Sequence, residues 1–325
     1  MSNFKIHIKT GNCSLCDKSL VIDRKYTEEL LCPECFAKDI ENKIYHTIED
    51  YNLFSPSDRI VVGLSGGKDS IALLYNLIIL QKNSKYSNKI KALIIDEGIP
   101  NYRKKSIELA KTFCEEYEIE YKIIKFQERI GKSLENTIIQ KRNSDNYKYA
   151  CNYCAIFRRR LLDEGTKELG GNVLAVGHNL TDIAETFLMN ILFKRFSLIA
   201  QKNIFGIKST QRNNLHFANK IKPLMKIPEE EIYLYVNIKK LKYYPSHCPY
   251  SKQDPIIRRK VLNFLLECKN IIPNVEFNLL DGYDTLSKTL KKYYKIGKKN
   301  NCQKCGCPSA DIICQYCIYK EEVNN

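Results

Sequence analysis

The sequence lacks an apolar run long enough to cross a membrane. The run over residues 71–80 is far shorter than the roughly 20 residues that a membrane-spanning helix needs. Residues 1–11 also lack the apolar core of a signal peptide. We therefore expect a cytoplasmic protein with no membrane partner. Its 325 residues are enough for one sizeable α/β domain with small appendages.

Acidic residues are scarce relative to basic ones. There are 37 Asp and Glu against 52 Lys and Arg, a net charge of +15, which favours a polyanionic partner such as RNA. Coding bias toward lysine in an AT-rich genome is a second source of this excess, and a solvated helix face is a second explanation for any one basic run. Basic residues also occur beside tyrosines, a combination suited to phosphate contact and base stacking: Lys141-Arg142, Arg158-Arg159-Arg160, Lys291-Lys292 and Lys298-Lys299 lie near Tyr147, Tyr149, Tyr293 and Tyr294.

No G-x-G-x-x-G motif lies near the Ser-Gly-Gly-Lys-Asp-Ser run, and the G-x-x-x-x-G-K-[ST] pattern fails there by one residue. The run directly follows an apolar, β-branched strand sequence. Its two glycines let backbone N–H groups approach a phosphate, its lysine adds charge, and a helix begins next to it. An ordinary strand-to-helix turn is the alternative. We predict a phosphate-binding loop made of Leu64, Ser65, Gly66, Gly67, Lys68, Asp69 and Ser70.

The chain has 14 cysteines, and a reducing cytoplasm makes metal binding a better explanation for them than disulfides. Near the N-terminus two C-x-x-C pairs are separated by 15 residues, which is zinc-ribbon spacing, and two more pairs near the C-terminus are closer together. Four thiolates leave no open position, so both zinc sites are expected to be structural. Cys307 is either a spare thiol or a rival ligand. The expected ligands are Cys13, Cys16, Cys32 and Cys35 in one site and Cys302, Cys305, Cys314 and Cys317 in the other.

Five cysteines remain. Cys114 and Cys268 lie in segments with helical apolar periodicity and are expected in the core. Cys151 and Cys154 precede a basic helix over residues 157–168, and their one unassigned partner is Cys248. These three could hold three irons of a 4Fe-4S cluster with the fourth iron open, or carry sulfur as persulfide and disulfide. A third zinc site that includes the neighbouring His247 is the alternative.

An alternating pattern of strands and helices runs between the terminal cysteine modules. Strands are predicted at residues 59–64, 89–95, 120–126 and 172–177, and helices at residues 70–81, 102–118 and 155–169. This order indicates an α/β fold with a doubly wound, mostly parallel sheet, in which ligands bind beyond the carboxyl ends of the strands. Asp96, Gly177 and His178 fall at that edge together with the phosphate loop. Asp182 and Glu185 would share one face of a helix that begins near Leu180, where Asp182 could orient Mg²⁺ and ATP or merely cap the helix.

These motifs together resemble the PP-loop tRNA 2-thiolation enzymes, and the resemblance covers nearly the whole chain. C-x-x-C followed by x-x-Phe-Arg-Arg is most similar to the archaeal and eukaryotic wobble-uridine thiolases. Ala155 departs from the glycine that is frequent there, and Cys307 is an extra thiol. We expect residues 1–50 to form a zinc ribbon and linker helix, residues 51–270 the catalytic domain, and residues 271–325 a helical segment and zinc module. The matching segments are residues 65–70, 96–99, 151–159, 177–186, 222–224 and 248–249.

The resemblance implies an ATP-dependent tRNA sulfurtransferase. It would adenylate the C2 oxygen of a tRNA uridine, at the wobble position, and replace it with sulfur delivered through a 4Fe-4S cluster. Catalytic roles then fall to Lys68, Asp69 and Asp182 together with Cys151, Cys154 and Cys248.

The resemblance also implies the cofactors and partners. The cofactors would be ATP, Mg²⁺, the cluster and two structural Zn²⁺ ions. The partners would be tRNA and a sulfur donor, either free sulfide or a ubiquitin-like thiocarboxylate protein, and a homodimer or a heterodimer with a related subunit is compatible. The alternatives are action on a T-loop uridine, cysteine persulfide chemistry, another PP-loop enzyme such as lysidine synthase, and a zinc-stabilised RNA-binding protein without catalysis.

Overall fold

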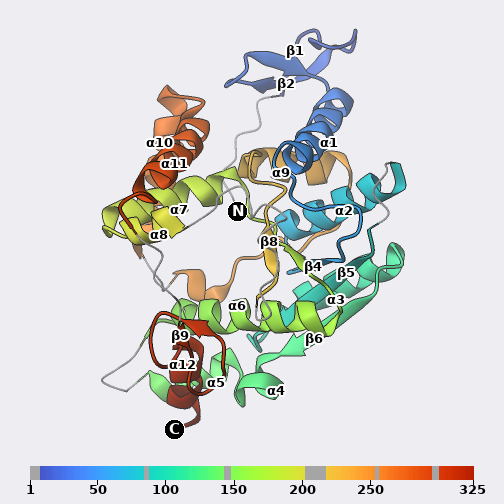
Figure 1. Cartoon of the computed structure of the whole chain (residues 1–325). Coiled ribbons are helices and arrows are strands. Elements are labelled where there is room, and N and C mark those ends of the chain that lie inside the picture. Colours follow the sequence, from blue (N-terminus) through green and yellow to red (C-terminus); the bar gives the residue numbers. More distant parts are fainter. Residues whose placement is uncertain (1–7, 84–87, 143–147, 202–216, 253–255, 295–299) are drawn as a thin grey trace.

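The computed structural model describes residues 8–83, 88–142, 148–201, 217–252, 256–294 and 300–325. A five-stranded parallel sheet lies at the centre, in the order β6-β5-β4-β7-β8 (Figure 1). This confirms the predicted α/β fold and its four strands, and it adds a short edge strand that the sequence pattern did not reveal. The strands are β4 (Ile60–Gly63), β5 (Ile90–Asp96), β6 (Tyr121–Lys125), β7 (Val173–Ala175) and β8 (Asn219–Ile221).

Helices cover both faces of this sheet, because successive strand residues point to opposite sides. Val62 and Ala92 contribute to one core, and their neighbours Val61 and Leu93 contribute to the other. The first core includes α1 (Pro33–Asp50), α2 (Lys68–Asn83), α3 (Arg103–Glu116) and α9 (Glu229–Ile238). The second includes α4 (Phe126–Ile130), α5 (Leu134–Lys141) and α6 (Ala150–Glu168). The doubly wound arrangement is therefore confirmed.

A third group of helices packs beside the sheet and carries the chain toward its C-terminal module. Helix α11 (Val275–Leu290) contacts α7 (Leu180–Leu192), α8 (Phe196–Gln201) and α10 (Ile256–Ile271). Phe187 and Tyr283 stack between α7 and α11, with ring centroids 4.7 Å apart. These contacts cross residue 270, which is the predicted domain boundary. The three domain ranges remain a prediction.

Small cysteine modules lie at the two ends of the chain (Figure 1). The first is an antiparallel sheet of β1 (Ile8–Thr10), β2 (Leu20–Arg24) and β3 (Glu29–Leu31), followed by α1. Its Arg24 is almost fully buried and binds Glu231 of α9 at 2.8 Å, which fixes the module to the central domain. The second consists of β9 (Asn300–Asn301), β10 (Pro308–Ser309) and α12 (Gln315–Asn324), and α12 packs against α6.

Two local predictions are wrong. Helix α6 begins at Ala150, not near residue 155, so Cys151 and Cys154 lie within its first two turns and do not precede it. Cys268, on α10, is half-buried and not a core residue, whereas Cys114 is fully buried as predicted. Within the described residues, no helix is long and apolar enough to cross a membrane.

Candidate active site and metal sites

The phosphate loop links the end of β4 to the start of α2 and is braced by its own serines. The Ser70 hydroxyl accepts a hydrogen bond from the Ser65 N–H at 3.1 Å and donates to the Gly67 carbonyl at 3.0 Å. The Ser65 hydroxyl in turn accepts from the Gly67 N–H at 3.3 Å. Leu64 is buried beneath the loop. The structure therefore has the strand, loop and helix order that an anion-binding loop needs.

Two glycines allow the close approaches that shape this edge of the sheet. Gly66 has φ +82°, and a Cβ there would lie 2.2 Å from the Ser106 carbonyl oxygen. Gly177 follows β7, and a Cβ there would lie 3.0 Å from the backbone of Asp69. Backbone of α3 therefore approaches the phosphate loop, the segment after β7 approaches the start of α2, and neither glycine position tolerates a side chain without rearrangement. His178 follows Gly177 and is exposed.

Lys68 and Asp69, the first residues of α2, are already engaged with other side chains. The Lys68 ammonium contacts Asp69 at 2.9 Å and Glu229 of α9 at 2.6 Å. Asp69 also accepts a hydrogen bond from the Asn179 side chain at 3.1 Å, which joins the loop to the start of α7. The sequence analysis did not identify Glu229.

Asp96, at the end of β5, accepts the N–H of Gly98 at 2.9 Å and shapes the turn there. The next residue, Glu97, was not predicted as a site residue. It is only 2% exposed and lies 2.6 Å from Arg103 Nε and 2.7 Å from Arg158. Arg103 also donates to the Ser65 carbonyl at 2.9 Å. Glu97 and its two arginines therefore connect the phosphate loop with helix α6.

Asp182 and Glu185 lie on one face of α7, as the spacing predicts. Asp182 forms a capping box with Asn179, so the capping alternative is shown. Both carboxylates face Arg258 of α10, at 3.4 Å from Asp182 and 2.7 Å from Glu185. Burial raises the pKa of Asp182, and the charge of Asp69 adds to that effect. Burial also raises the pKa of Glu185 to about 7, although Arg258 opposes the shift.

The three unassigned cysteines gather between α6 and the loop before the 3₁₀ helix η2 (Pro249–Lys252), and η2 contacts α6. The segment that leads to Cys248 is tied to the phosphate loop, because the Tyr244 N–H donates to the Gly66 carbonyl at 2.8 Å. Burial raises the pKa of Cys154 to about 12, and the nearby thiols of Cys248 and Cys151 reinforce the effect. The structure thus places this thiol group next to the phosphate loop.

The donor set of this group is three thiols, the ligand type that iron–sulfur clusters take. In each of the two terminal four-cysteine sets, all four sulfurs lie within 4.8 Å of one another. Among the described residues, Cys151, Cys154 and Cys248 do not form such a compact set. A cluster binds each thiolate through a different iron, so its ligands stand farther apart than ligands that share one ion. Arg158 donates to the Cys154 sulfur at 3.1 Å, and a cation there offsets thiolate charge. No described set supports the alternative zinc site with His247.

Both terminal four-cysteine sets are compact enough for zinc. Sulfurs at two corners of a tetrahedral site are about 3.8 Å apart, given a Zn–S distance of about 2.3 Å. Cys16 and Cys32 are separated by 3.6 Å, and Cys302 and Cys317 by 3.9 Å. The N–H of Cys314 lowers the pKa of Cys302 to about 6, which favours the thiolate. The predicted ligands of each site are therefore assembled in the structure.

Cys307 is not part of the compact C-terminal set. It is buried, and its sulfur accepts a hydrogen bond from Arg160 of α6. Arg160 also pairs with Glu164 at 2.5 Å and lies over the Tyr316 ring of α12, 5.2 Å from its centroid. Cys307 thus joins the C-terminal module to α6.

The predicted basic surface is only partly available. Arg158 and Arg159 are both exposed, although Arg158 also makes the contacts described above, whereas Arg160 is half-buried. Lys291 and Lys292 are exposed beside Tyr293, which is 76% exposed. Tyr149 and Tyr294 are exposed as well. Tyr147, Lys298 and Lys299 lie outside the described residues.

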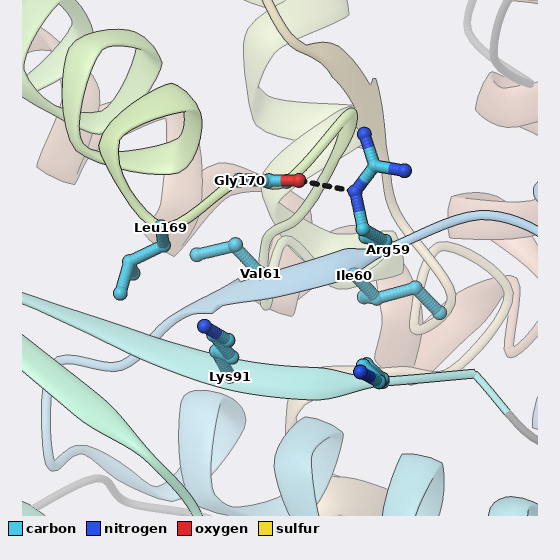
Figure 2. A pocket seen from close by; sticks show the side chains of 8 residues that line it. Arg59, Ile60, Val61, Lys91, Leu169 and Gly170 are labelled. Atoms are coloured by element: carbon cyan, nitrogen blue, oxygen red, sulfur yellow. Dashed lines mark hydrogen bonds between the residues drawn. The ribbon is translucent and has the colours of Figure 1, made fainter.

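A cavity of about 260 Å³ lies elsewhere, at the amino ends of β4 and β5 (Figure 2). Its floor is apolar, with Val61 and Leu169, and Arg59 beside it donates to the Gly170 carbonyl. Because the phosphate loop follows the carboxyl end of β4, this cavity is at the opposite edge of the sheet and does not belong to the candidate site.

Comparisons with known proteins agree with this architecture. The PP-loop domain family matches residues 36–265. The "Probable sulfurtransferase" of Methanocaldococcus jannaschii is 36% identical over 94% of this chain and 86% of its own length. The Danio rerio "Cytoplasmic tRNA 2-thiolation protein 1" is 33% identical over 96% of this chain and 88% of its own length.

A solved structure agrees over nearly its full length. The U34-tRNA thiolase NcsA from Methanococcus maripaludis, solved with its [4Fe-4S] cluster, superimposes with a TM-score of 0.80 at 30% identity, covering 96% of each chain. The match includes both terminal modules as well as the sheet, since so little of either chain is left out. This chain therefore belongs to the PP-loop family, in the group that contains the tRNA 2-thiolation proteins.

Proposed function

We propose that this protein is a cytoplasmic, ATP-dependent tRNA sulfurtransferase that converts a uridine, at the wobble position, into 2-thiouridine. One observation carries the proposal: the chain segment that leads to Cys248 is hydrogen-bonded to the phosphate loop. Tyr244 joins them through the Gly66 carbonyl. A zinc-stabilised RNA-binding protein without catalysis would need neither the loop nor this thiol group.

The first step is adenylation. The uridine C2 oxygen attacks the α-phosphorus of ATP, the bond between the α-phosphorus and the bridging oxygen breaks, and pyrophosphate leaves. The loop amides and the N-terminus of α2 bind the phosphates. Lys68 offsets the charge on the leaving pyrophosphate, and Asp69 and Asp182 would bind Mg²⁺.

The second step replaces oxygen with sulfur. A sulfide attacks the activated C2 carbon, the C2–O bond breaks, and AMP leaves with the oxygen. Cys151, Cys154 and Cys248 would hold a 4Fe-4S cluster. With three protein ligands, one iron would be left for the sulfur donor, and binding to a metal favours the deprotonated form of the sulfur. The Arg158 guanidinium, beside Cys154 and Glu97, keeps positive charge next to these thiolates.

The tRNA surface includes the exposed basic and aromatic residues on the C-terminal side of α11. Lys291 and Lys292 suit backbone phosphates, and Tyr293 suits stacking on an unpaired base. The relatives named as cytoplasmic proteins support the location. The sulfur donor, free sulfide or a thiocarboxylate protein, and a dimeric assembly are part of the same proposal.

Nucleoside mass spectrometry tests the function. Unmodified tRNA is incubated anaerobically with the protein, ATP and sulfide, and iron and zinc are measured in the same preparation. We expect 2-thiouridine at the wobble position, dependent on ATP and absent with Lys68→Ala or Asp69→Ala. Lys82→Ala, at the exposed end of α2, is the matched control. Thiolation in the T-loop would correct the position, and an unmodified tRNA would refute the activity.

A further inference from the structure

Lys222 approaches the candidate site from a fourth strand, β8. Strands β7 and β8 pair in parallel, with Ile221 opposite Ala175. Lys222 is therefore the next residue beyond the carboxyl end of β8. Continuing this register sets Lys222 opposite Val176, one residue before Gly177, whose backbone approaches Asp69. The Lys222-Pro223-Leu224 motif thus lies at the same edge of the sheet as the phosphate loop.

The turn after β8 is fixed against the start of α7. The Met225 N–H donates to the Lys222 carbonyl at 3.1 Å, and the Leu180 N–H donates to the Ile227 carbonyl at 3.0 Å. Leu180 is the first residue of α7, the helix that carries Asp182. The backbone of Lys222 is consequently held close to the acidic face of that helix.

The charge environment of Lys222 differs from that of the other cations at this edge. Those cations are each held by a carboxylate: Lys68, Arg103, Arg158 and Arg258. Lys222 has no ion pair or hydrogen bond from its ammonium to any residue in the described ranges. Burial lowers its pKa, and the charge of Asp182 only partly opposes this. Lys222 is half-buried, and a partly desolvated ammonium without a carboxylate partner is stabilised when an anion binds it.

We propose that Lys222 is a catalytic residue that binds the α-phosphate of ATP, the phosphate that remains in AMP. This inference rests on the proposed function. The loop amides and Lys68 account for the pyrophosphate part, so the α-phosphate is the remaining anion at this edge. Negative charge on its oxygens grows during adenylation, and a positioned cation stabilises that charge. A phosphate of the tRNA backbone is the other source of the same chemistry.

Ligand binding and catalysis of Lys222→Gln test the proposal. Without tRNA, we expect Lys222→Gln to weaken AMP binding at least tenfold and to leave adenosine and pyrophosphate binding within twofold. With tRNA and ATP saturating, its pyrophosphate release should fall by about 10²- to 10³-fold, the effect of removing one donor to a developing oxyanion. Lys226→Gln, in the same loop, removes the same charge and should behave as the parent.

The ammonium also gives a pH signature. Because its pKa is lowered, the parent should lose the rate of pyrophosphate release as pH rises through that pKa. Lys222→Arg, which stays charged, should release pyrophosphate at least tenfold faster than Lys222→Gln. Its rate should not fall over the pH range in which the rate of the parent falls.

Three outcomes would overturn the proposal. The first is unchanged AMP binding in Lys222→Gln. The second is weaker tRNA binding of Lys222→Gln with an unchanged rate at saturation, which would assign Lys222 to the tRNA backbone. The third is a rate that falls at high pH in Lys222→Arg as it does in the parent. The last comparison still decides the case if Lys222→Gln does not fold. A parent protein that binds AMP but releases no pyrophosphate with tRNA would refute the proposed function and leave the AMP measurement to judge Lys222.

Discussion

Glu97 and Arg103 form a buried ion pair, with 2.6 Å between Oε2 and Nε and exposures of 2% and 5%. The same carboxylate binds Arg158, and Arg103 also binds the carbonyl of Ser65. One acid therefore compensates two cations that belong to different parts of the site. Its loss would leave buried charge unpaired next to the phosphate loop.

We expect Glu97→Gln to destabilise the protein by about 3–5 kcal/mol, because it leaves Arg103 buried without a counter-charge. The free energy of unfolding is measured by chemical denaturation. Glu128→Gln removes the exposed partner of Lys125 and should cost less than about 1 kcal/mol. Equal stability of the two variants would contradict the assignment.

Replacement of a cysteine in a terminal module should remove zinc and spare the iron. We expect Cys13→Ser and Cys302→Ser each to lose one of two zinc ions and some stability, because each set closes a module too small to fold on its core. Metal content is measured by elemental analysis of the anaerobic protein. Loss of iron from Cys13→Ser would show that this partition is wrong.

Single Cys→Ala variants distinguish a cluster from persulfide chemistry. A cluster needs Cys151, Cys154 and Cys248 alike, so each variant should lose roughly four irons per chain together with thiolation. Persulfide transfer needs a carrier and a resolving thiol, so it leaves one of the three dispensable. Cys268→Ala, on α10, should keep iron and activity. An active Cys248→Ala, or an iron-free protein that thiolates at full rate, would refute the cluster.

Glu185 makes stability depend on pH. Its pKa rises from an ordinary value of 4.5 to about 7 through burial. Between these values the folded state holds one proton more than the unfolded chain, so the free energy of unfolding falls as pH rises. Relative to Glu185→Gln, the parent should lose up to about 3 kcal/mol from pH 4.5 to 7. A difference that stays flat over this range would contradict the shift.

The sequence predicts the structure best where neighbouring residues follow a regular spacing. The apolar strands, the Ser65-to-Ser70 loop and the paired cysteines follow from periodicity and spacing. Strand β8 has three residues and no clear alternation, so no pattern could reveal it. The predicted start of α6 is wrong because the pattern sets Cys151 and Cys154 before the helix, although both lie within it.

The side-chain partners within the site could not be predicted from one sequence. Glu97 and Arg158 are 61 positions apart, and Arg258 meets Glu185 across 73 positions. No periodicity links residues at such separations, and only the packing of α6, α7 and α10 brings them together. An acid directly after Asp96, at the end of a buried strand, was the one local signal for Glu97.

The contact between Cys307 and Arg160 links the C-terminal module to the helix that carries Cys151 and Cys154. The helix is continuous from Ala150 to Glu168, with Cys151 and Cys154 near one end and Arg160 in its middle. A displacement of the C-terminal module would act on this helix through the Arg160 contact and through Tyr319, whose ring centroid lies 5.2 Å from that of Tyr153. The last residues of the chain therefore brace the helix that carries Cys151 and Cys154, although they supply none of the three central thiols.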